Sequence, residues 1–287
     1  HSVEQVCCPP QDFEIHDMRA ELLEAHSSGK LMLFVGAGVS ANLGLPSWSQ
    51  LISQIAQELG YDPAVFATYG NYQTLAEFYK KKRGGLGELR SWMDREWHKP
   101  STDIKASDIH RLITLGNFSR IYTTNYDRWL EIAHAEFGVK YDRIASVADM
   151  VAVSDGHRQI IKFHGDFAAD ESIVLDETSY YQRLNFDTPL DIKLRNDVLS
   201  NSVLFIGYSL TDFNIRLLFY RLTEMWGKSP LASARPKSYI FTNRPNPAAE
   251  EVLRHWGIEM IVSDEDDPKT ALTGFLQELV TSPGLAC

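Results

Sequence analysis

Residues 31–41 read LMLFVGAGVSA, and this stretch decides the fold. Its first five residues are apolar and glycines bound them, which is typical of a buried strand in a parallel sheet. The next six residues, Gly36–Ala41, fit the pattern G-x-G-x-x-[G/A]. There the first glycine permits a tight turn, the second lets backbone N–H groups approach a diphosphate, and the small third residue lets the helix pack closely. The stretch therefore predicts a strand and a nucleotide-binding turn; the alternative is a glycine-rich turn between packed elements.

The segment after this turn disfavours a dehydrogenase. In dehydrogenases an acidic residue about 20 positions further on ends a second strand and holds the ribose. Here Glu58 lies near the end of a predicted helix, because Ser47–Leu59 has apolar residues at helical spacing and Gly60 follows. No charged residue occurs from Leu31 to Gln57, but the continuous apolar run is five residues long, far short of the roughly 20 that a membrane span requires.

Strands and helices alternate along the second half of the chain. Short apolar runs predict strands at Arg120–Thr123, Gln159–Phe163, Ser172–Leu175, Val203–Ile206, Ser238–Phe241 and Ile258–Ile261. Helical periodicity predicts helices at Asp127–Phe137, Thr178–Leu184, Pro189–Leu199, Asp212–Met225, Ala248–Trp256 and Lys269–Leu279. We therefore expect an α/β fold with a doubly wound, Rossmann-like parallel sheet of six or seven strands, which binds ligands at the carboxyl ends of its strands.

The first half of the chain is expected to be mainly helical. Residues 1–15 resemble a flexible arm, and a helix follows around Asp17–His26. Between residues 61 and 115 no strand is convincing, and helices are predicted at Leu75–Lys82 and Leu86–Trp97. We therefore expect a flexible arm over residues 1–15 and a single domain over 16–287, with a helical insertion at about 61–115.

Composition excludes several classes of protein. Hydrophobic residues make up 44% of the 287, enough for a sizeable core, so the chain is not expected to be disordered. The net charge of −10 argues against direct, non-specific nucleic-acid binding. The three cysteines, Cys7, Cys8 and Cys287, lie at the ends, so neither a disulfide framework nor a zinc site is expected. We expect a cytoplasmic protein with no metal and no membrane attachment.

Polar residues follow several of the predicted strands. They read TTNYD at 123–127, HGD at 164–166, GYSLTD at 207–212 and TN at 242–243. His164 could be a general base, since the free pKa of histidine lies near 6.5; the alternative is a histidine that bonds neighbouring backbone. Asp127 could instead cap the next helix, and Asn243 could belong to a simple turn. Because the carboxyl ends of parallel strands share one edge, these motifs together point to one ligand site.

The order of the motifs GAGVS, TTNYD, HGD, GYSLTD and TN resembles the sirtuin family, and more closely the sirtuin-like NADase domains of prokaryotic antiviral defence systems. The resemblance covers about residues 20–262 and implies NAD as the substrate. It implies that Asn125 orients the nicotinamide ribose or the attacking water, that Asp127 contacts the nicotinamide amide, and that His164 acts on the ribose hydroxyls. It further implies that the NAD phosphates are bound by Gly36, Ala37, Gly38 and Ser40. The adenosine side of NAD would be bound by Gly207, Ser209 and Asn243.

Two departures separate this sequence from the protein deacylases of that family. They carry a four-cysteine zinc ribbon, whereas no cysteine occurs here between Cys8 and Cys287. They also carry a GIPDFR-type segment, whereas residues 44–49 read GLPSWS. The expected function is therefore NAD+ glycohydrolysis, which gives nicotinamide and ADP-ribose and depletes NAD in abortive-infection defence. The alternatives are a zinc-free deacylase or ADP-ribosyltransferase, and a non-catalytic module that senses NAD or ADP-ribose.

An enzyme that destroys NAD must be controlled in its own cell. The resemblance implies control by a regulatory protein on another chain, either a HerA-type ATPase or an Argonaute-like protein, or control by self-assembly. We therefore expect a homo-oligomer with such a partner. Exposed-looking aromatic residues of the helical insertion could serve as contact anchors; the alternative is that they pack inside.

Overall fold

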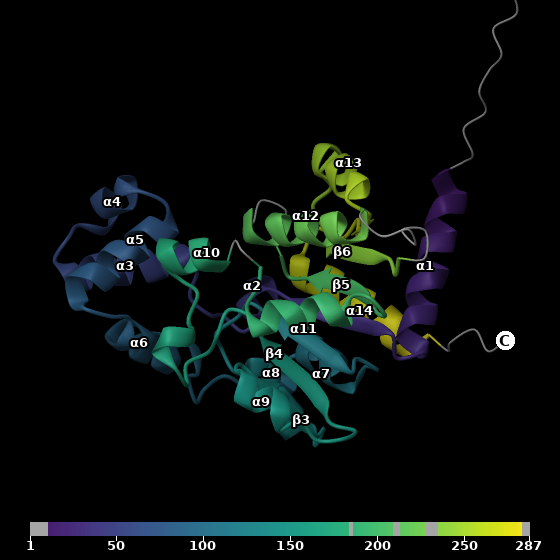
Figure 1. Cartoon of the computed structure of the whole chain (residues 1–287), viewed down its shortest axis with the longest axis horizontal. Coiled ribbons are helices and arrows are strands. Elements are labelled where there is room, and N and C mark those ends of the chain that lie inside the picture. The colour runs from purple at the N-terminus through teal and green to yellow at the C-terminus, as the bar shows by residue number, and fades with distance from the viewer. Residues whose placement is uncertain (1–10, 184–185, 209–212, 228–234, 283–287) are drawn as a thin grey trace, which may run out of the picture.

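A seven-stranded parallel sheet lies at the centre of the computed structural model, which describes residues 11–183, 186–208, 213–227 and 235–282 (Figure 1). Its spatial order is β3-β4-β2-β1-β5-β6-β7, and every neighbouring pair is parallel. The strands are β1 (Leu31–Val35), β2 (Arg120–Thr123), β3 (Tyr141–Ile144), β4 (Arg158–Lys162), β5 (Ser202–Ile206), β6 (Ser238–Thr242) and β7 (Ile258–Val262). The predicted doubly wound α/β fold is confirmed.

Two helical layers cover the sheet because successive side chains of each strand point to opposite faces. Leu31, Leu33 and Val35 of β1 belong to one apolar core, and Met32 and Phe34 belong to the other. The first core is covered by α1 (Gln11–Ser27), α7 (Asp108–Leu115), α8 (Trp129–Glu136) and α14 (Pro268–Thr281). The second is covered by α9 (Val147–Val151), α11 (Pro189–Asp197), α12 (Phe213–Gly227) and α13 (Pro247–His255).

A separate group of helices stands beside the sheet, at the left of Figure 1. It comprises α3 (Trp48–Leu59), α4 (Pro63–Phe66), α5 (Tyr72–Arg83) and α6 (Gly87–Trp97), with α10 (Glu177–Arg183) against α5. These helices share a third core with Tyr126 and the segment 167–175. In this core Tyr79 is fully buried and Phe78, Trp92 and Trp97 are partly buried, whereas Tyr69 and Tyr72 are 59% and 46% exposed. Most of the aromatic residues proposed as contact anchors therefore pack inside.

Three expectations about individual segments were wrong. Ser172–Leu175 is not a strand: this apolar run is buried beneath the helical group, where Val174 N–H donates to the carbonyl of His164 at 3.0 Å. Strand β3 was missed, because an edge strand with one neighbour tolerates Asp142 and Arg143 and shows no apolar run. Helix α1 begins at Gln11, so residues 11–15 are helical instead of part of an arm.

Packing also defines which helices between β1 and β2 form the helical group beside the sheet. All residues between β1 and β2 are described, and they contain helices and no strand. Ile109 and Leu112 of α7 lie in the first core of the sheet, whereas Leu51 and Ile52 of α3 lie in the third core. The helices that pack apart from the sheet are therefore those from α3 to α6.

Candidate functional site

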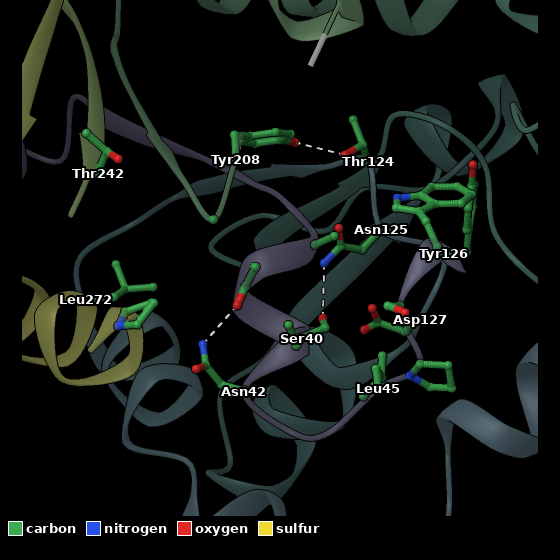
Figure 2. Close-up of a pocket in the computed structure, with 18 of the residues that line it drawn as sticks. Ser40, Asn42, Leu45, Thr124, Asn125, Tyr126, Asp127, Tyr208, Thr242 and Leu272 are labelled. Atoms are coloured by element: carbon green, nitrogen blue, oxygen red, sulfur yellow. Dashed lines mark hydrogen bonds between the residues drawn. The ribbon is translucent and has the colours of Figure 1, made fainter. Parts of the chain in front are cut away.

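A cavity of about 750 Å³ opens at the carboxyl ends of β1, β2, β4, β5 and β6 (Figure 2). The chain leaves β1 toward β2 on one side, and β5 lies on the other, so the cavity straddles the point where the strand order reverses. Ligands of open parallel sheets bind at such points, and 300–1,000 Å³ is the usual volume of a small-molecule pocket. Trp48 and Leu51 of α3 and Trp97 of α6 form an apolar wall facing the strand ends.

The fold brings together most of the residues that the sequence motifs singled out. Those that line the cavity are Ala37, Gly38, Ser40, Asn125, Asp127, His164, Gly207 and Asn243. Gly36 does not line it and is buried directly before α2 (Ala37–Ala41). Ser209 lies outside the described residues.

Asn125 ties the turn after β2 to the turn after β1. Its Nδ2 donates to Oγ of Ser40 at 3.1 Å (Figure 2). The same Nδ2 donates to the carbonyl of Gly36, also at 3.1 Å, and the residue is 8% exposed. Its backbone N–H donates to Oγ1 of Thr123 at 3.0 Å, and that hydroxyl donates to the carbonyl of Val35 at 2.8 Å. Both amide hydrogens of the side chain are therefore engaged, which leaves its carbonyl oxygen as an acceptor for a ligand or water.

The turns after β1 and β5 pack so closely that both must have glycine at the point of contact. A Cβ at Gly36 would lie 2.5 Å from the carbonyl oxygen of Gly207, and one at Gly38 would lie 2.9 Å from the same atom. Gly207 has φ +72, and its own Cβ would lie 2.8 Å from the backbone nitrogen of Val39. The sequence pattern attributes Gly38 to the approach of a diphosphate. The structure gives a further reason: two backbone turns meet here without room for a side chain.

Asp127 has a structural role as well as a place on the cavity wall. Its Oδ1 accepts from the backbone N–H of Trp129 at 3.1 Å, an Asx turn before helix α8, and the residue is 4% exposed. Its backbone carbonyl accepts a hydrogen bond from Nζ of Lys162. The capping alternative and the ligand-facing interpretation of Asp127 are therefore compatible.

His164 lies at the end of β4 with its ring against the ring of Tyr180, 5.7 Å between centroids and perpendicular. Burial, and to a smaller extent the nearby positive charge of Arg183, lowers the pKa of His164 from 6.5 to about 3. At neutral pH the imidazole is uncharged and can accept a hydrogen bond. A base this weak is better suited to orienting a hydroxyl group than to removing its proton fully.

Other cavity residues were missed by the motif analysis. Tyr208 donates to the carbonyl of Val35 at 3.0 Å, and its hydroxyl lies 3.0 Å from that of Thr124. Arg244 lines the cavity beyond β6, next to Asn243, whose Nδ2 donates to the carbonyl of Asp266 at 2.9 Å. Each of these residues is adjacent in sequence to a predicted site residue. The polar segment that faces the cavity after each strand is therefore longer than the residues singled out from the motifs.

Within the described ranges, no group of three or more His, Cys, Asp and Glu side chains could hold a metal ion. No helix in the same ranges is long and apolar enough to cross a membrane.

Two further histidines, His110 of α7 and His134 of α8, make the fold sensitive to acid. Burial lowers the pKa of both His110 and His134 from 6.5 to about 4, and both are fully buried. Between pH 6.5 and 4 the unfolded chain binds protons that the folded chain does not, so acid favours unfolding. The stabilisation is complete above pH 6.5 and is lost as the pH falls toward 4, by about 3 kcal/mol for each histidine.

We therefore expect the melting temperature to fall steeply between pH 6.5 and 4.5. The His110→Gln/His134→Gln double variant should show a clearly smaller fall, the remainder coming partly from His164 and His26, whose pKa values burial also lowers. His255→Gln, at an exposed position of α13, should show the full fall. Melting curves by circular dichroism across this pH range measure the effect. An unchanged pH dependence in the double variant would contradict the assignment.

Residues 119–261 match the model of a family described as the SIR2-like domain. The chain is 29% identical over 250 residues to defense-associated sirtuin 2 of Bacillus subtilis, covering 82% of this chain and 23% of that protein. It is 27% identical over 220 residues to the NAD(+) hydrolase ThsA of Bacillus cereus, covering 76% and 44%, respectively. The chain thus spans less than half the length of these relatives. Among solved structures, one from a study of Sir2 enzymes aligns over 91% of this chain and 96% of that chain, with 16% identity and a TM-score of 0.46.

Proposed function

We propose that this chain is an NAD+ glycohydrolase, which cleaves NAD to nicotinamide and ADP-ribose; the match of residues 119–261 to the SIR2-like domain supports the proposal. The observation that carries the proposal is the meeting of Asn125, Asp127 and His164 in one cavity with the glycine-rich turn after β1. Relatives named as NAD(+) hydrolases support it.

The chemistry required is modest and matches the groups present. Nicotinamide is a cationic, good leaving group in NAD, and cleavage of its bond to ribose passes through an oxocarbenium-like state, as in other glycoside hydrolyses. In our proposal the carbonyl oxygen of Asn125 and the neutral imidazole of His164 orient the attacking water and the ribose hydroxyls. The carboxylate of Asp127 holds the nicotinamide amide. Ala37, Gly38 and Ser40 hold the phosphates, and Gly207, Ser209 and Asn243 contact the adenosine side. Gly36, which is buried and whose N–H donates to the carbonyl of Ile206, shapes the turn instead.

Incubation of NAD with the protein alone tests the reaction. Chromatography should detect equal amounts of nicotinamide and ADP-ribose, with no acceptor added. A deacylase or an ADP-ribosyltransferase would release nicotinamide only when an acylated peptide or an acceptor is present. A sensing module would bind NAD saturably and release none, even with its partner. Release that depends on an acceptor, or none at all, would contradict the glycohydrolase proposal.

We further propose that this activity depletes NAD during antiviral defence in the cytoplasm; the name of the Bacillus subtilis relative associates that protein with defence. Control would come from homo-oligomerisation or from a HerA-type ATPase or Argonaute-like protein on another chain. Light scattering combined with the nicotinamide assay tests this. A monomer that is fully active alone would contradict it.

A further inference from the structure

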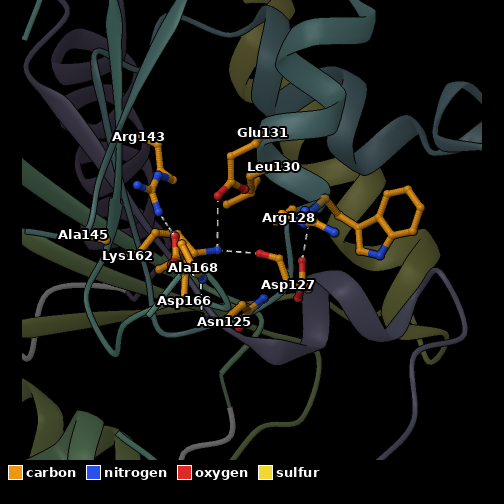
Figure 3. A network of polar contacts seen from close by, with 12 residues as sticks. Asn125, Asp127, Arg128, Leu130, Glu131, Arg143, Ala145, Lys162, Asp166 and Ala168 are labelled. Atoms are coloured by element: carbon orange, nitrogen blue, oxygen red, sulfur yellow. Dashed lines mark hydrogen bonds and ion pairs between the residues drawn. The ribbon is translucent and has the colours of Figure 1, made fainter. Parts of the chain in front are cut away.

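A lysine is fully buried beside the site, on the side of the turn away from the cavity. Lys162 is the last residue of β4 and its side chain is 0% exposed. Its Nζ donates a hydrogen bond to the backbone carbonyl of Asp127 and lies 3.3 Å from Oε1 of Glu131 on α8 (Figure 3). Lys162 does not line the cavity. An ammonium group buried in this way is costly, so its position calls for an explanation.

The carbonyl that Lys162 holds belongs to the turn that carries two of the proposed catalytic residues. Asn125 and Asp127 lie in the five residues between β2 and α8. Their side chains fix the front of this turn, through Gly36 and Ser40 for Asn125 and through the Trp129 N–H for Asp127. The hydrogen bond from Lys162 holds the backbone of the same turn at the carbonyl of Asp127.

The same lysine is two residues from His164. The strand end that carries His164 and the turn that carries Asn125 are therefore joined at Lys162, in addition to the bond from Phe163 N–H to the carbonyl of Thr123 at 2.8 Å. Glu131 is 6% exposed and its carboxylate has no hydrogen-bond partner among the described residues, so its contact with Nζ is purely ionic. This contact draws Nζ toward α8, the helix that follows the turn.

We propose that Lys162 is a positioning residue for cleavage of NAD, one that sets the placement of Asn125 and Asp127 relative to His164. The inference rests on the proposed function. Stability alone does not account for the pair, because a buried ion pair is commonly no more stabilising than two apolar side chains of similar size. Placement does account for it, since a displacement of about 1 Å in a reacting group can cost 100-fold in rate.

Three variants separate positioning from stability. Lys162→Met removes the charge at similar length but leaves Glu131 buried without its cation. Lys162→Met/Glu131→Leu removes both charges and restores an apolar contact. Lys193→Met is the matched control, since Lys193 is a partly buried lysine of α11 whose Nζ lies 3.0 Å from Asp197 and which does not line the cavity.

Lys162→Met should lower both kcat for nicotinamide release, by about 100-fold, and the melting temperature, by roughly 10 °C. The double variant should regain most of the melting temperature but none of the kcat. The Kd for ADP-ribose, measured by calorimetry, should change less than about threefold in both, because ADP-ribose lacks the nicotinamide that Asp127 is proposed to hold. Lys193→Met should lower the melting temperature without changing kcat. Recovery of kcat in the double variant, or a parallel loss of ADP-ribose affinity, would overturn the inference.

Hydrogen exchange tests the placement without relying on activity. The backbone amides of residues 124–128 should exchange faster in both Lys162 variants than in the wild type. In Lys193→Met their exchange rates should be unchanged. If the wild type released no nicotinamide, the proposed function would fail, but faster exchange in the Lys162 variants would still show that Lys162 positions the turn. Unchanged exchange at these amides would overturn the inference by itself.

Discussion

Replacement of His164 by alanine is expected to lower nicotinamide release from NAD by at least about 100-fold, the scale of losing one positioned proton-handling group. Asn125→Ala should have an effect of the same size. No described residue makes a hydrogen bond to the ring nitrogens of His164, so its removal should cost only the ring contacts with Phe163 and Tyr180. Asn125 differs, because its side chain also joins Gly36 to Ser40, and its loss should lower the free energy of unfolding by about 1–2 kcal/mol.

The measurement is the initial rate of nicotinamide release at saturating NAD, with melting curves for each variant. His255→Ala, a change at an exposed histidine of α13, serves as the matched control and should leave both quantities unchanged. Because the pKa of His164 is lowered to about 3, its ionisation should not affect the rate between pH 8 and 5. Folded variants that cleave NAD at the wild-type rate would show that the site is assigned wrongly.

Gly165→Ala should be among the most destabilising single substitutions in the chain. Gly165 has φ +81, and an added Cβ would lie 2.0 Å from the backbone oxygen of Ser172 and 2.4 Å from its carbon. Backbone atoms cannot turn aside as a flexible side chain can, so the loop after His164 must move. We expect a loss of about 4 kcal/mol, which combines overpacking with a left-handed backbone, and a fall in melting temperature of roughly 10 °C.

Gly156→Ala is the matched control for this prediction. Gly156 has φ +74, almost the same backbone conformation, but nothing lies within 4 Å of an added Cβ. It should cost only about 1 kcal/mol. Chemical denaturation of both variants gives the two free energies of unfolding. Equal losses would mean that contact with Ser172 contributes nothing. Gly165→Ala should also reduce nicotinamide release, since the displaced loop carries His164.

The strands at the centre of the sheet could be predicted closely from sequence. The bounds of β1 and β2 agree with the predicted ones residue for residue, because a central strand is buried on both faces and its apolar run coincides with the strand. Ile173–Leu175 is also a buried apolar run, but the helical group buries it instead of a second strand. An apolar run thus reports burial and does not report what causes it.

The candidate site was also largely determined by sequence, because polar residues after parallel strands must meet at one edge of the sheet. Only the tertiary structure decided how these residues are held. The carbonyl of Asp127 meets a lysine 35 residues away, and the turn at Gly36–Gly38 meets the backbone of Gly207. Local patterns specify which face of an element is buried. Which backbone carbonyl receives a buried cation, and where two turns touch, depends on the packing of segments far apart in the chain.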